Sequence, residues 1–359
     1  MESAITGIHP SFKLNGISFS KEDLLEVGYC LIKEGVDYEK TIGEFLLDWL
    51  SAKDSVKAFT SGSSGTPKTI ELKKRHMVNS ALATGSFFNL KPGDKALHCL
   101  PTTFIAGKMM LIRAMLLGLE LDYVEPTSKP MLEVNKLYDF VAMIPLQLQN
   151  SINKLSLVKT LIVGGAPFPV KLQKDVFNTQ TSIFETYGMT ETITHIAVRK
   201  IEFKFEGSFF EALPDIKLSV DDRSCLIIDA PKICSTPVIT NDVVNLISNT
   251  RFQWLGRFDN VINSGGIKLY PEKIEQQLAD LIEDNFFVTS FEDSILGEKL
   301  ILVIEGNENK DLHTHLKDSA LLEKYEIPKE IYFTAKFSFT KNGKIQRQET
   351  LDKLKIKSN

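Results

Sequence analysis

The sequence predicts an α/β protein in two parts, a large N-terminal region of stacked sheets and helices and a small α+β region at the C-terminal end. Three observations support this. Between about Lys57 and Ala230, short apolar strand-like runs alternate with helical stretches, which is the order that α/β layers require. Residues 256–270 are rich in glycine and asparagine, and a periodic helical pattern over residues 271–282 follows them. The length of 359 residues, with 43% hydrophobic residues, is enough for more than one core.

Individual elements follow from periodicity and length. Residues 1–56 show short mixed elements, of which residues 38–50 have the pattern of an amphipathic helix. Buried strands are expected at residues 139–144 and 158–163, because both are mainly apolar runs of strand length. The same reasoning places helices at residues 111–119 and 170–177, and strands of a smaller β-rich section at residues 216–220 and 225–229.

The glycine-rich stretch that starts at Gly256 predicts a hinge between two domains. A boundary at this point gives a large domain of residues 1–257 and a small mobile domain of residues 258–359. About a hundred residues is an ordinary size for a small folding unit.

Composition excludes several classes of protein. The net charge is -4, with 42 basic and 46 acidic residues, so there is no global basic field for a nucleic-acid backbone. The N-terminal residues lack an export-signal pattern, and the most hydrophobic segment, residues 109–119, is interrupted by Arg113. Four cysteines without a CxxC pair predict neither a disulfide framework nor a zinc site. We therefore expect a cytoplasmic protein without nucleic-acid or membrane partners.

Residues 58–69, with the sequence AFTSGSSGTPKT, have the composition of a phosphate-binding loop. Glycines let successive backbone N–H groups face one anion, hydroxyl groups donate further hydrogen bonds, and a lysine adds a cation. Composition alone leaves a plain glycine-serine linker open. A Walker loop is excluded, because two residues separate the last glycine from the lysine. The predicted phosphate-binding residues are Thr60, Ser61, Gly62, Ser63, Ser64, Gly65 and Lys68.

The segment TSGSSGTPK at residues 60–68 resembles the signature loop of the acyl-adenylate-forming superfamily, which includes acyl-CoA and aryl-CoA synthetases, luciferases and nonribosomal adenylation domains. Further motifs of that family follow in the right order. The resemblance implies an ATP- and Mg²⁺-dependent ligase that joins a carboxylic acid to AMP and then to coenzyme A. It also implies a large adenylate-forming domain, shortened at its N-terminus because the loop begins near residue 60, and a small domain that rotates on a hinge.

The segment FETYGMTET at residues 184–192 resembles the family's YGxTE motif. In that family the tyrosine packs on adenine, the threonine meets the α-phosphate and the glutamate holds magnesium, which implies these roles for Tyr187, Thr190 and Glu191, with Gly188 between them. An aromatic face suits a purine, and a hard carboxylate oxygen suits Mg²⁺. Without the resemblance, Glu191 is typical of a surface loop.

Glycines mark two further motifs. Gly164, Gly165 and Ala166 follow a predicted buried strand, where a diglycine permits close approach of a flat ligand, although an ordinary strand-to-helix turn has the same pattern. Gly265 and Gly266 resemble the motif that the family turns toward its first domain to line the pantetheine tunnel. Glycines at that place let a narrow thiol arm pass close to the backbone.

Three charged residues near the predicted boundary match ribose and hinge positions of the family. Asp242 lies where relatives have an aspartate that accepts both ribose hydroxyls. Asn241 replaces the usual glycine before it, and asparagine tolerates a left-handed backbone better than most residues. Arg257 resembles the arginine near ribose and phosphate, and Asp259 the hinge residue. The alternative for this pair is a surface ion pair of small energetic value.

Lys344, in TKNGKIQR at residues 340–347, resembles the family's C-terminal catalytic lysine. Two unit charges about 4 Å apart repel by roughly 4 kcal/mol at an effective dielectric near 20, and a carboxylate must approach a triphosphate that closely. A cation between them cancels this repulsion. By charge pattern alone, the basic tail at residues 341–357 is typical of a solvated helix face.

The acid is indicated by a finer resemblance. The segments GRFDN and NSGG, with the ETYGMTET run, are similar to the o-succinylbenzoate:CoA ligases of menaquinone biosynthesis. Arg113 lies within the apolar run MMLIRAMLLG and is costly to bury unless it meets an anion, such as the substrate's second carboxylate. A snorkelling side chain or an internal salt bridge is the alternative. Phe104 offers an aromatic wall where many relatives have histidine.

Three other functions stay open from the sequence. They are another aryl- or acyl-CoA synthetase, a stand-alone adenylation enzyme that loads a carrier protein, and a nucleotide-binding protein without activity. The absence of an attached carrier domain disfavours the second, and joint retention of Lys68, Glu191, Asp242 and Lys344 disfavours the third. A homo-oligomer is left open.

Overall fold

The structure is a computed structural model that describes residues 7–59, 69–202, 209–279, 281–308, 311–318, 321–339 and 345–354. The chain forms two compact units by its internal contacts. The first unit comprises Met1–Ser219, Ile227–Thr240 and Leu246–Gln253, and the second comprises Val220–Leu226, Asn241–Asn245 and Trp254–Asn359. The boundary of independently moving domains at residues 257/258 stays a prediction.

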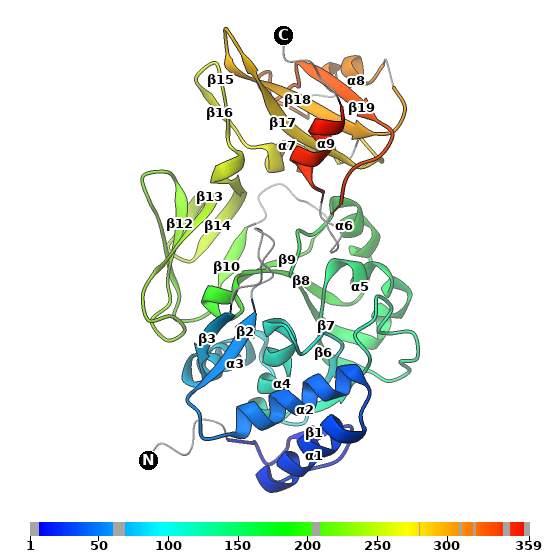
Figure 1. Cartoon of the computed structure of the whole chain (residues 1–359), viewed down its shortest axis with the longest axis vertical. Helices are drawn as coiled ribbons and strands as arrows, with labels where there is room; N and C mark the ends of the chain where they lie inside the picture. The colour runs from blue at the N-terminus through cyan, green and yellow to red at the C-terminus, as the bar shows by residue number, and fades with distance from the viewer. Residues whose placement is uncertain are drawn as a thin grey trace. The chain divides into compact units, whose positions relative to one another are not determined.

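The first unit begins with two 14-residue helices, α1 (Lys21–Glu34) and α2 (Asp37–Leu50), which lie side by side (Figure 1). A capping box starts α1, because the Asp23 N–H donates to Ser20 Oγ at 3.1 Å and the Ser20 N–H donates to Asp23 Oδ2 at 2.9 Å. The prediction of short mixed elements before residue 56 was therefore wrong for α1. Its apolar stripe is weak, and the capping box was the signal that could have revealed it.

Most strands of the first unit belong to one large mixed sheet, whose strands β11 to β14 also include residues of the second unit. Its strands run in the spatial order β1-β5-β4-β6-β7-β8-β9-β10-β14-β13-β12-β11. The six strands from β1 to β8 in this order pair in parallel, and β9 and β10 pair antiparallel. Their bounds are β1 Lys13–Leu14, β4 Lys95–His98, β5 Glu120–Tyr123, β6 Tyr138–Met143, β7 Val158–Val163, β8 Ser182–Gly188, β9 His195–Lys200 and β10 Phe210–Ala212.

The helices of this unit connect its strands, as parallel pairing requires. They are α3 (Lys74–Phe88), α4 (Ile105–Leu117), α5 (Pro145–Gln149), the 3-10 turn η1 (Ile152–Leu157) and α6 (Val170–Val176). A core of apolar side chains that includes Leu97, Val141, Leu161 and Phe168 packs against the central strands. Parallel strands covered in this way are continuous apolar runs, which is why β6 and β7 were predictable.

The remaining strands of the large sheet are β11 (Lys217–Val220), β12 (Cys225–Asp229), β13 (Val238–Ser248) and β14 (Arg251–Arg257). A separate hairpin of β2 (Ser55–Phe59) and β3 (Thr69–Lys73) pairs antiparallel, with Phe59 opposite Thr69.

The second unit has its own five-stranded sheet of order β16-β15-β18-β17, with β19 parallel to β18. Side chains of Ile274, Val288 and Leu302 lie in the core beneath it. A 3-10 turn, η3 (Phe258–Asn260), precedes these strands. The elements are β15 Ile262–Ser264, β16 Ile267–Leu269, α7 Pro271–Leu278, β17 Phe286–Asp293, β18 Gly297–Glu305, α8 Leu312–Asp318, β19 Glu330–Thr334 and α9 Arg347–Lys353.

The predicted fold class is confirmed, and most segments fall where periodicity placed them. Helix α4 starts at Ile105 instead of residue 111, since its residues 109–115 are all buried and leave no polar face to define a period. Helix α7 ends at Leu278 instead of residue 282. In the described part of the chain, no helix has the length and apolar character that a membrane crossing requires.

A substitution tests the contact between α1 and α2. A Cβ atom at Gly43 would lie 2.5 Å from the Gly28 carbonyl oxygen. Alanine for glycine in an exposed helix stabilises by about 1 kcal/mol, but we expect Gly43→Ala to destabilise the chain by about 1–3 kcal/mol through overpacking. Chemical denaturation followed by circular dichroism measures the difference. Glu44→Ala, at an exposed position of the same helix, is the control and should leave the unfolding midpoint nearly unchanged.

Candidate active site

Two predicted parts of the site lie outside the described residues. These are the phosphate-binding segment at residues 60–68 and the predicted catalytic Lys344. The structure describes their flanks. The strands on either side of residues 60–68, β2 and β3, pair with one another. Phe339 and Ile345, on either side of residues 340–344, form an isolated antiparallel bridge.

The glycine motif after β7 packs tightly against β8. A Cβ atom at Gly164 would lie 2.1 Å from Thr186 Oγ1, a hydroxyl that donates to the Val163 carbonyl at 3.2 Å. Gly165 has a φ of +82°, which favours glycine. Both glycines are thus required by local geometry, and Ala166 follows them at an exposed position. The backbone of this loop runs close beside the strand that carries Tyr187.

Tyr187 is held by an aromatic cluster within the first unit. Its ring centroid lies 5.1 Å from that of Phe252 and 5.7 Å from that of Phe210, and the two phenylalanine rings stack at 5.3 Å. Such contacts fix the plane of a partly exposed ring. Gly188, the next residue, allows β9 to approach, because a Cβ atom there would lie 2.2 Å from the Thr194 carbonyl oxygen.

A buried ion pair supports the same cluster. Glu185 and Arg199 face each other across β8 and β9 and are bonded through Arg199 Nη2 and Glu185 Oε2. Arg199 also lies over the Phe210 ring at 5.0 Å, and Glu185 Oε1 accepts the Phe168 N–H at 3.3 Å. Burial raises the pKa of Glu185, while the neighbouring Arg199 opposes that shift. Sequence reasoning missed this pair, which connects Tyr187's supporting ring to the end of the glycine loop.

Thr190 and Glu191 lie in a 3-10 turn, η2 (Thr190–Thr192), directly after β8. The Thr192 hydroxyl accepts the Met189 N–H at 3.1 Å, and Cys234 Sγ donates to the Glu191 carbonyl oxygen at 3.3 Å. The Glu191 side chain is exposed and offers hard oxygen atoms of the kind that Mg²⁺ prefers. Among the described residues, no group of three or more histidine, cysteine or acidic side chains is arranged to hold a metal ion.

Ile193, next in the chain, has a φ of +66° and is 2% exposed. A β-branched residue in this conformation is an outlier that costs of order 1–3 kcal/mol and persists only where the surrounding structure imposes it. It redirects the chain from η2 into β9. Nothing in the sequence indicates this conformation, because isoleucine is an ordinary strand residue.

In the second unit, the structure brings together Asp242, Arg257 and Asp259. Asp242 is 7% exposed, and its Oδ1 accepts the Trp254 indole N–H at 3.2 Å. Arg257 lies between the two carboxylates. Its Nη1 is 3.6 Å from Asp242 Oδ1, and its Nη2 is 3.4 Å from Asp259 Oδ2. The ion pair considered as the alternative for Arg257 and Asp259 is therefore present, beside a carboxylate held in one orientation.

Asn241 has a different role from the expected one. It lies within β13 and is not among the described residues with positive φ, so the left-handed tolerance of asparagine is not used. Its side-chain amide donates to Asp259 Oδ2 at 3.5 Å, and its carbonyl oxygen accepts from Arg223 Nη1 at 3.3 Å. Asparagine in place of the family's glycine thus adds a side-chain hydrogen bond to Asp259, the predicted hinge residue.

Gly265 and Gly266 form the two-residue turn between β15 and β16. Their φ angles are +58° and +81°, and Ser264 pairs with Ile267 across the turn. Two consecutive positive φ angles define the hairpin turn that glycine favours most. Apart from its chain neighbours, no atom of the described residues lies within 4 Å of a Cβ position at Gly266, so the backbone there is bare.

Arg113 of α4 is buried at 1% exposure. Its Nη2 donates to Thr194 Oγ1 at 3.4 Å, its Nη1 contacts Met110 Sδ at 3.7 Å, and its Nε has no hydrogen-bond partner among the described residues. In the described part of the chain no carboxylate forms an ion pair with it, and burial lowers its pKa to about 9. The snorkelling side chain and the internal salt bridge considered from the sequence are therefore both absent there. Phe104 lies at the start of α4 and is 49% exposed.

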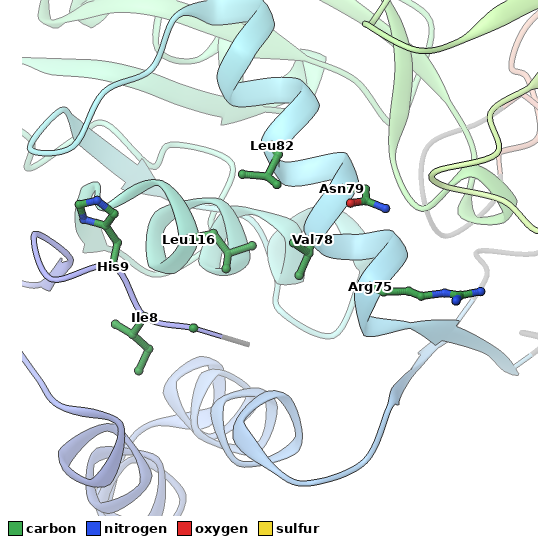
Figure 2. A pocket seen from close by; sticks show the side chains of 8 residues that line it. Ile8, His9, Arg75, Val78, Asn79, Leu82 and Leu116 are labelled. Atoms are coloured by element: carbon green, nitrogen blue, oxygen red, sulfur yellow. The ribbon is translucent and has the colours of Figure 1, made fainter. Parts of the chain in front are cut away.

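A surface pocket of about 400 Å³ lies beside α3. Its side chains come from α3, α4 and the segment before β1, as Figure 2 shows. It contains no predicted site residue, and the amide of Asn79 in its wall is already bonded to the Lys232 carbonyl at 2.7 Å. We do not assign it to the active site.

Comparison with known proteins identifies the family. Residues 48–225 match the family described as AMP-binding enzyme. The chain is 36% identical to the crystallised acyl-CoA synthetase (AMP-forming)/AMP-acid ligase II-like protein from Dyadobacter fermentans, with a TM-score of 0.60, covering 89% of this chain and 95% of that one. The chain belongs to the AMP-binding enzyme family. It is therefore an enzyme of the AMP-forming ligase class, as its motifs predict.

More distant relatives of this AMP-binding enzyme are also similar along most of its length. The 2-succinylbenzoate--CoA ligase of Listeria monocytogenes is 23% identical over 358 residues, which cover 90% of this chain and 74% of that protein. The o-succinylbenzoate coenzyme A synthetase (MenE) of Bacillus subtilis, solved with ATP and magnesium ion, is 19% identical with a TM-score of 0.71. The match covers 93% of this chain and 82% of that one. The second likeness establishes the fold alone.

The contact between Gly164 and Thr186 gives a test of the nucleotide site. We expect Gly164→Ala to displace the loop beside Tyr187 and to weaken ATP binding roughly tenfold, which corresponds to about 1.4 kcal/mol. Isothermal titration calorimetry measures this. The double variant Gly164→Ala/Thr186→Ala removes the clashing hydroxyl and should recover most of the affinity, with Thr186→Ala alone as the control. Equal affinity of Gly164→Ala and the wild type would contradict the role of this loop.

Proposed function

We propose that this enzyme activates o-succinylbenzoate. In the first step a carboxylate oxygen of the acid attacks the α-phosphorus of ATP, and pyrophosphate leaves with the breaking P–O bond. In the second step the thiol of coenzyme A, losing its proton, attacks the acyl carbon, and AMP leaves. The products are o-succinylbenzoyl-CoA, AMP and pyrophosphate. Relatives that match most of the chain are named 2-succinylbenzoate--CoA ligases, which supports this substrate. One buried side chain gives the main structural support.

That side chain is Arg113. A buried cation without an ionic partner costs several kcal/mol, and proteins accept this cost mainly where an anion completes the site. The described residues provide Arg113 with a hydroxyl and a thioether but no carboxylate. o-Succinylbenzoate has two carboxylates, so one remains an anion while the other is activated. A planar guanidinium binds a carboxylate through two parallel hydrogen bonds, which suits this unreacted group.

The nucleotide and its metal fit the residues that the structure describes. The ring of Tyr187, held by Phe252, offers a face for adenine, and the exposed backbone at Gly165 allows close approach. Asp242, oriented by Trp254, accepts the ribose hydroxyls beside Arg257. Glu191 supplies an exposed carboxylate for Mg²⁺, which when bound offsets the charge of the phosphates.

The second step requires the thiol of coenzyme A to reach the acyl carbon. The hairpin tip at Gly265 and Gly266 is suited to a narrow pantetheine arm, since neither residue has a side chain and the Cβ position at Gly266 is open among the described residues. Asp259 is the proposed hinge between adenylating and thiol-transferring arrangements. Its carboxylate contacts both Arg257 and Asn241, so the hinge residue is linked to the proposed ribose site.

Lys344 is the proposed cation between the reacting anions. We expect Lys344→Ala to lower the adenylation rate at least about a hundredfold, as loss of one preorganised donor does in acyl transfer. Thioester formation from chemically prepared acyl-AMP should change little. Single-turnover measurement of each half-reaction separates the two. The neighbouring Lys341→Ala is the control, and equal loss of both half-reactions would remove the proposed role.

The substrate is tested by ATP–pyrophosphate exchange over a panel of o-succinylbenzoate, benzoates and fatty acids. We expect the wild type to prefer o-succinylbenzoate. Arg113→Leu should lower kcat/KM for that acid roughly a hundredfold, in line with the 2–5 kcal/mol lost when a buried charge pair is truncated. Its activity on a monocarboxylic aryl acid should change much less.

Arg113→Lys retains the charge without the planar fork and should give an intermediate value. A wild type that prefers a monocarboxylic acid would overturn the proposed substrate. It would point to another aryl- or acyl-CoA synthetase. Transfer to a carrier-protein thiol instead of coenzyme A would overturn the proposed acceptor.

A further inference from the structure

A chain of polar contacts leads from Arg113 through the partly buried Thr194 to buried side chains of the first unit. Arg113 Nη2 contacts Thr194 Oγ1 at 3.4 Å, and Thr194 Oγ1 contacts His195 Nδ1 at 3.4 Å. His195 Nε2 contacts Thr84 Oγ1 at 3.4 Å, and the Thr84 hydroxyl donates to the Ser80 carbonyl at 3.0 Å. Arg113, His195 and Thr84 are 1%, 5% and 0% exposed. The four contacts connect helices α3 and α4 with the start of β9.

The end of this chain fixes the direction of every hydrogen bond in it. The Ser80 carbonyl can only accept, so the Thr84 hydroxyl uses its proton there and must accept from His195 Nε2–H. In a neutral imidazole the other nitrogen, Nδ1, is then an acceptor. The Thr194 hydroxyl therefore donates to His195 Nδ1. Its oxygen lone pairs remain for Arg113 Nη2, which can only donate.

We propose that Thr194 is a positioning residue that orients the Arg113 guanidinium toward the substrate's unreacted carboxylate, and that neutral His195 holds the Thr194 hydroxyl in the required rotation. The inference rests on the proposed function for the identity of the anion. Neither residue touches the reacting atoms. Their effect is on which acid binds.

The neutral state of His195 follows from its surroundings. Burial and the nearby Arg113 charge together lower the pKa of His195 well below its usual value. A protonated ring would carry a proton on Nδ1 and would donate it to Thr194 Oγ1. That oxygen already accepts a hydrogen bond from Arg113 Nη2. The Thr194 proton would then lose its acceptor at a partly buried position, which disfavours the protonated ring. The neutral ring also leaves Arg113 as the cation for the substrate.

The backbone places Thr194 with little freedom. Its carbonyl accepts the Thr192 hydroxyl at 2.9 Å, and it lies where only glycine at position 188 leaves room. Ile193, with its unfavourable φ, separates Thr194 from η2, the turn with Thr190 and Glu191. The proposed acid-recognition contact is thus built onto the same short segment as the proposed phosphate and magnesium contacts.

Thr194→Val tests the proposal, because it keeps the shape and removes the hydroxyl. We expect KM for o-succinylbenzoate to rise roughly tenfold or more, the scale of a hydrogen bond to a charged group, with kcat, KM for ATP and activity on a monocarboxylic aryl acid little changed. Thr194→Ser should restore most of the loss. Thr181→Val is the matched control, since Thr181 is a buried threonine of the same unit whose hydroxyl donates to Leu155 O at 2.7 Å. An unchanged KM in Thr194→Val, or an equal rise in Thr181→Val, would overturn the proposal.

A measurement without substrate separates this inference from the proposed function. In the ligand-free enzyme with ¹⁵N-labelled histidine, the His195 signal, identified by its loss in His195→Gln, should show a neutral ring protonated at Nε2 at neutral pH. Protonation at Nδ1 would overturn the hydrogen-bond chain. Failure of the wild type to activate o-succinylbenzoate, with the Nε2 tautomer observed, would reject the proposed function and with it the proposed anion. The hydrogen-bond chain itself would stand.

Discussion

The central constraint on this site is a buried positive charge, Arg113, that no carboxylate in the described part of the chain balances. Folding removes this guanidinium from water, and the described residues return a hydroxyl and a thioether contact. The same burial lowers the pKa of Arg113. Such an arrangement is costly for stability and useful for selection, because a ligand with a second anionic group supplies what the protein lacks. A monocarboxylic acid, once activated, leaves the deficit in place.

The rest of the site is arranged around close backbone packing on both sides of β8. Gly164 and Gly188 each lie where a side chain would collide with a neighbouring chain segment. Ile193, between η2 and β9, has the unfavourable positive φ angle. These contacts bring the glycine loop, the Tyr187 ring and the turn with Glu191 onto one short stretch of structure. A buried ion pair between Glu185 of β8 and Arg199 of β9 supports the same segment. A precise binding site requires such rigid support.

The sequence predicted what depends on local pattern and motif. Strands β6, β7 and β12 are mainly apolar runs of strand length, and the phosphate, YGMTE and lysine motifs indicated the family. It did not predict features that exist only after folding. The start of α4 was missed because a helix buried all round has no period, and the Arg113–Thr194–His195 contacts join residues from separate elements. The positive φ of Ile193 is imposed by its surroundings, since isoleucine itself disfavours it. The capping box of α1 was a readable signal that was overlooked.

The most direct test of the central claim is a crystal structure of the enzyme with a nonhydrolysable o-succinylbenzoyl-adenylate mimic. We expect the unreacted carboxylate to lie within about 3 Å of the Arg113 guanidinium, with the Thr194 hydroxyl still bonded to the same side chain. A structure in which that carboxylate points to solvent, or in which a protein carboxylate occupies the guanidinium of Arg113, would contradict it.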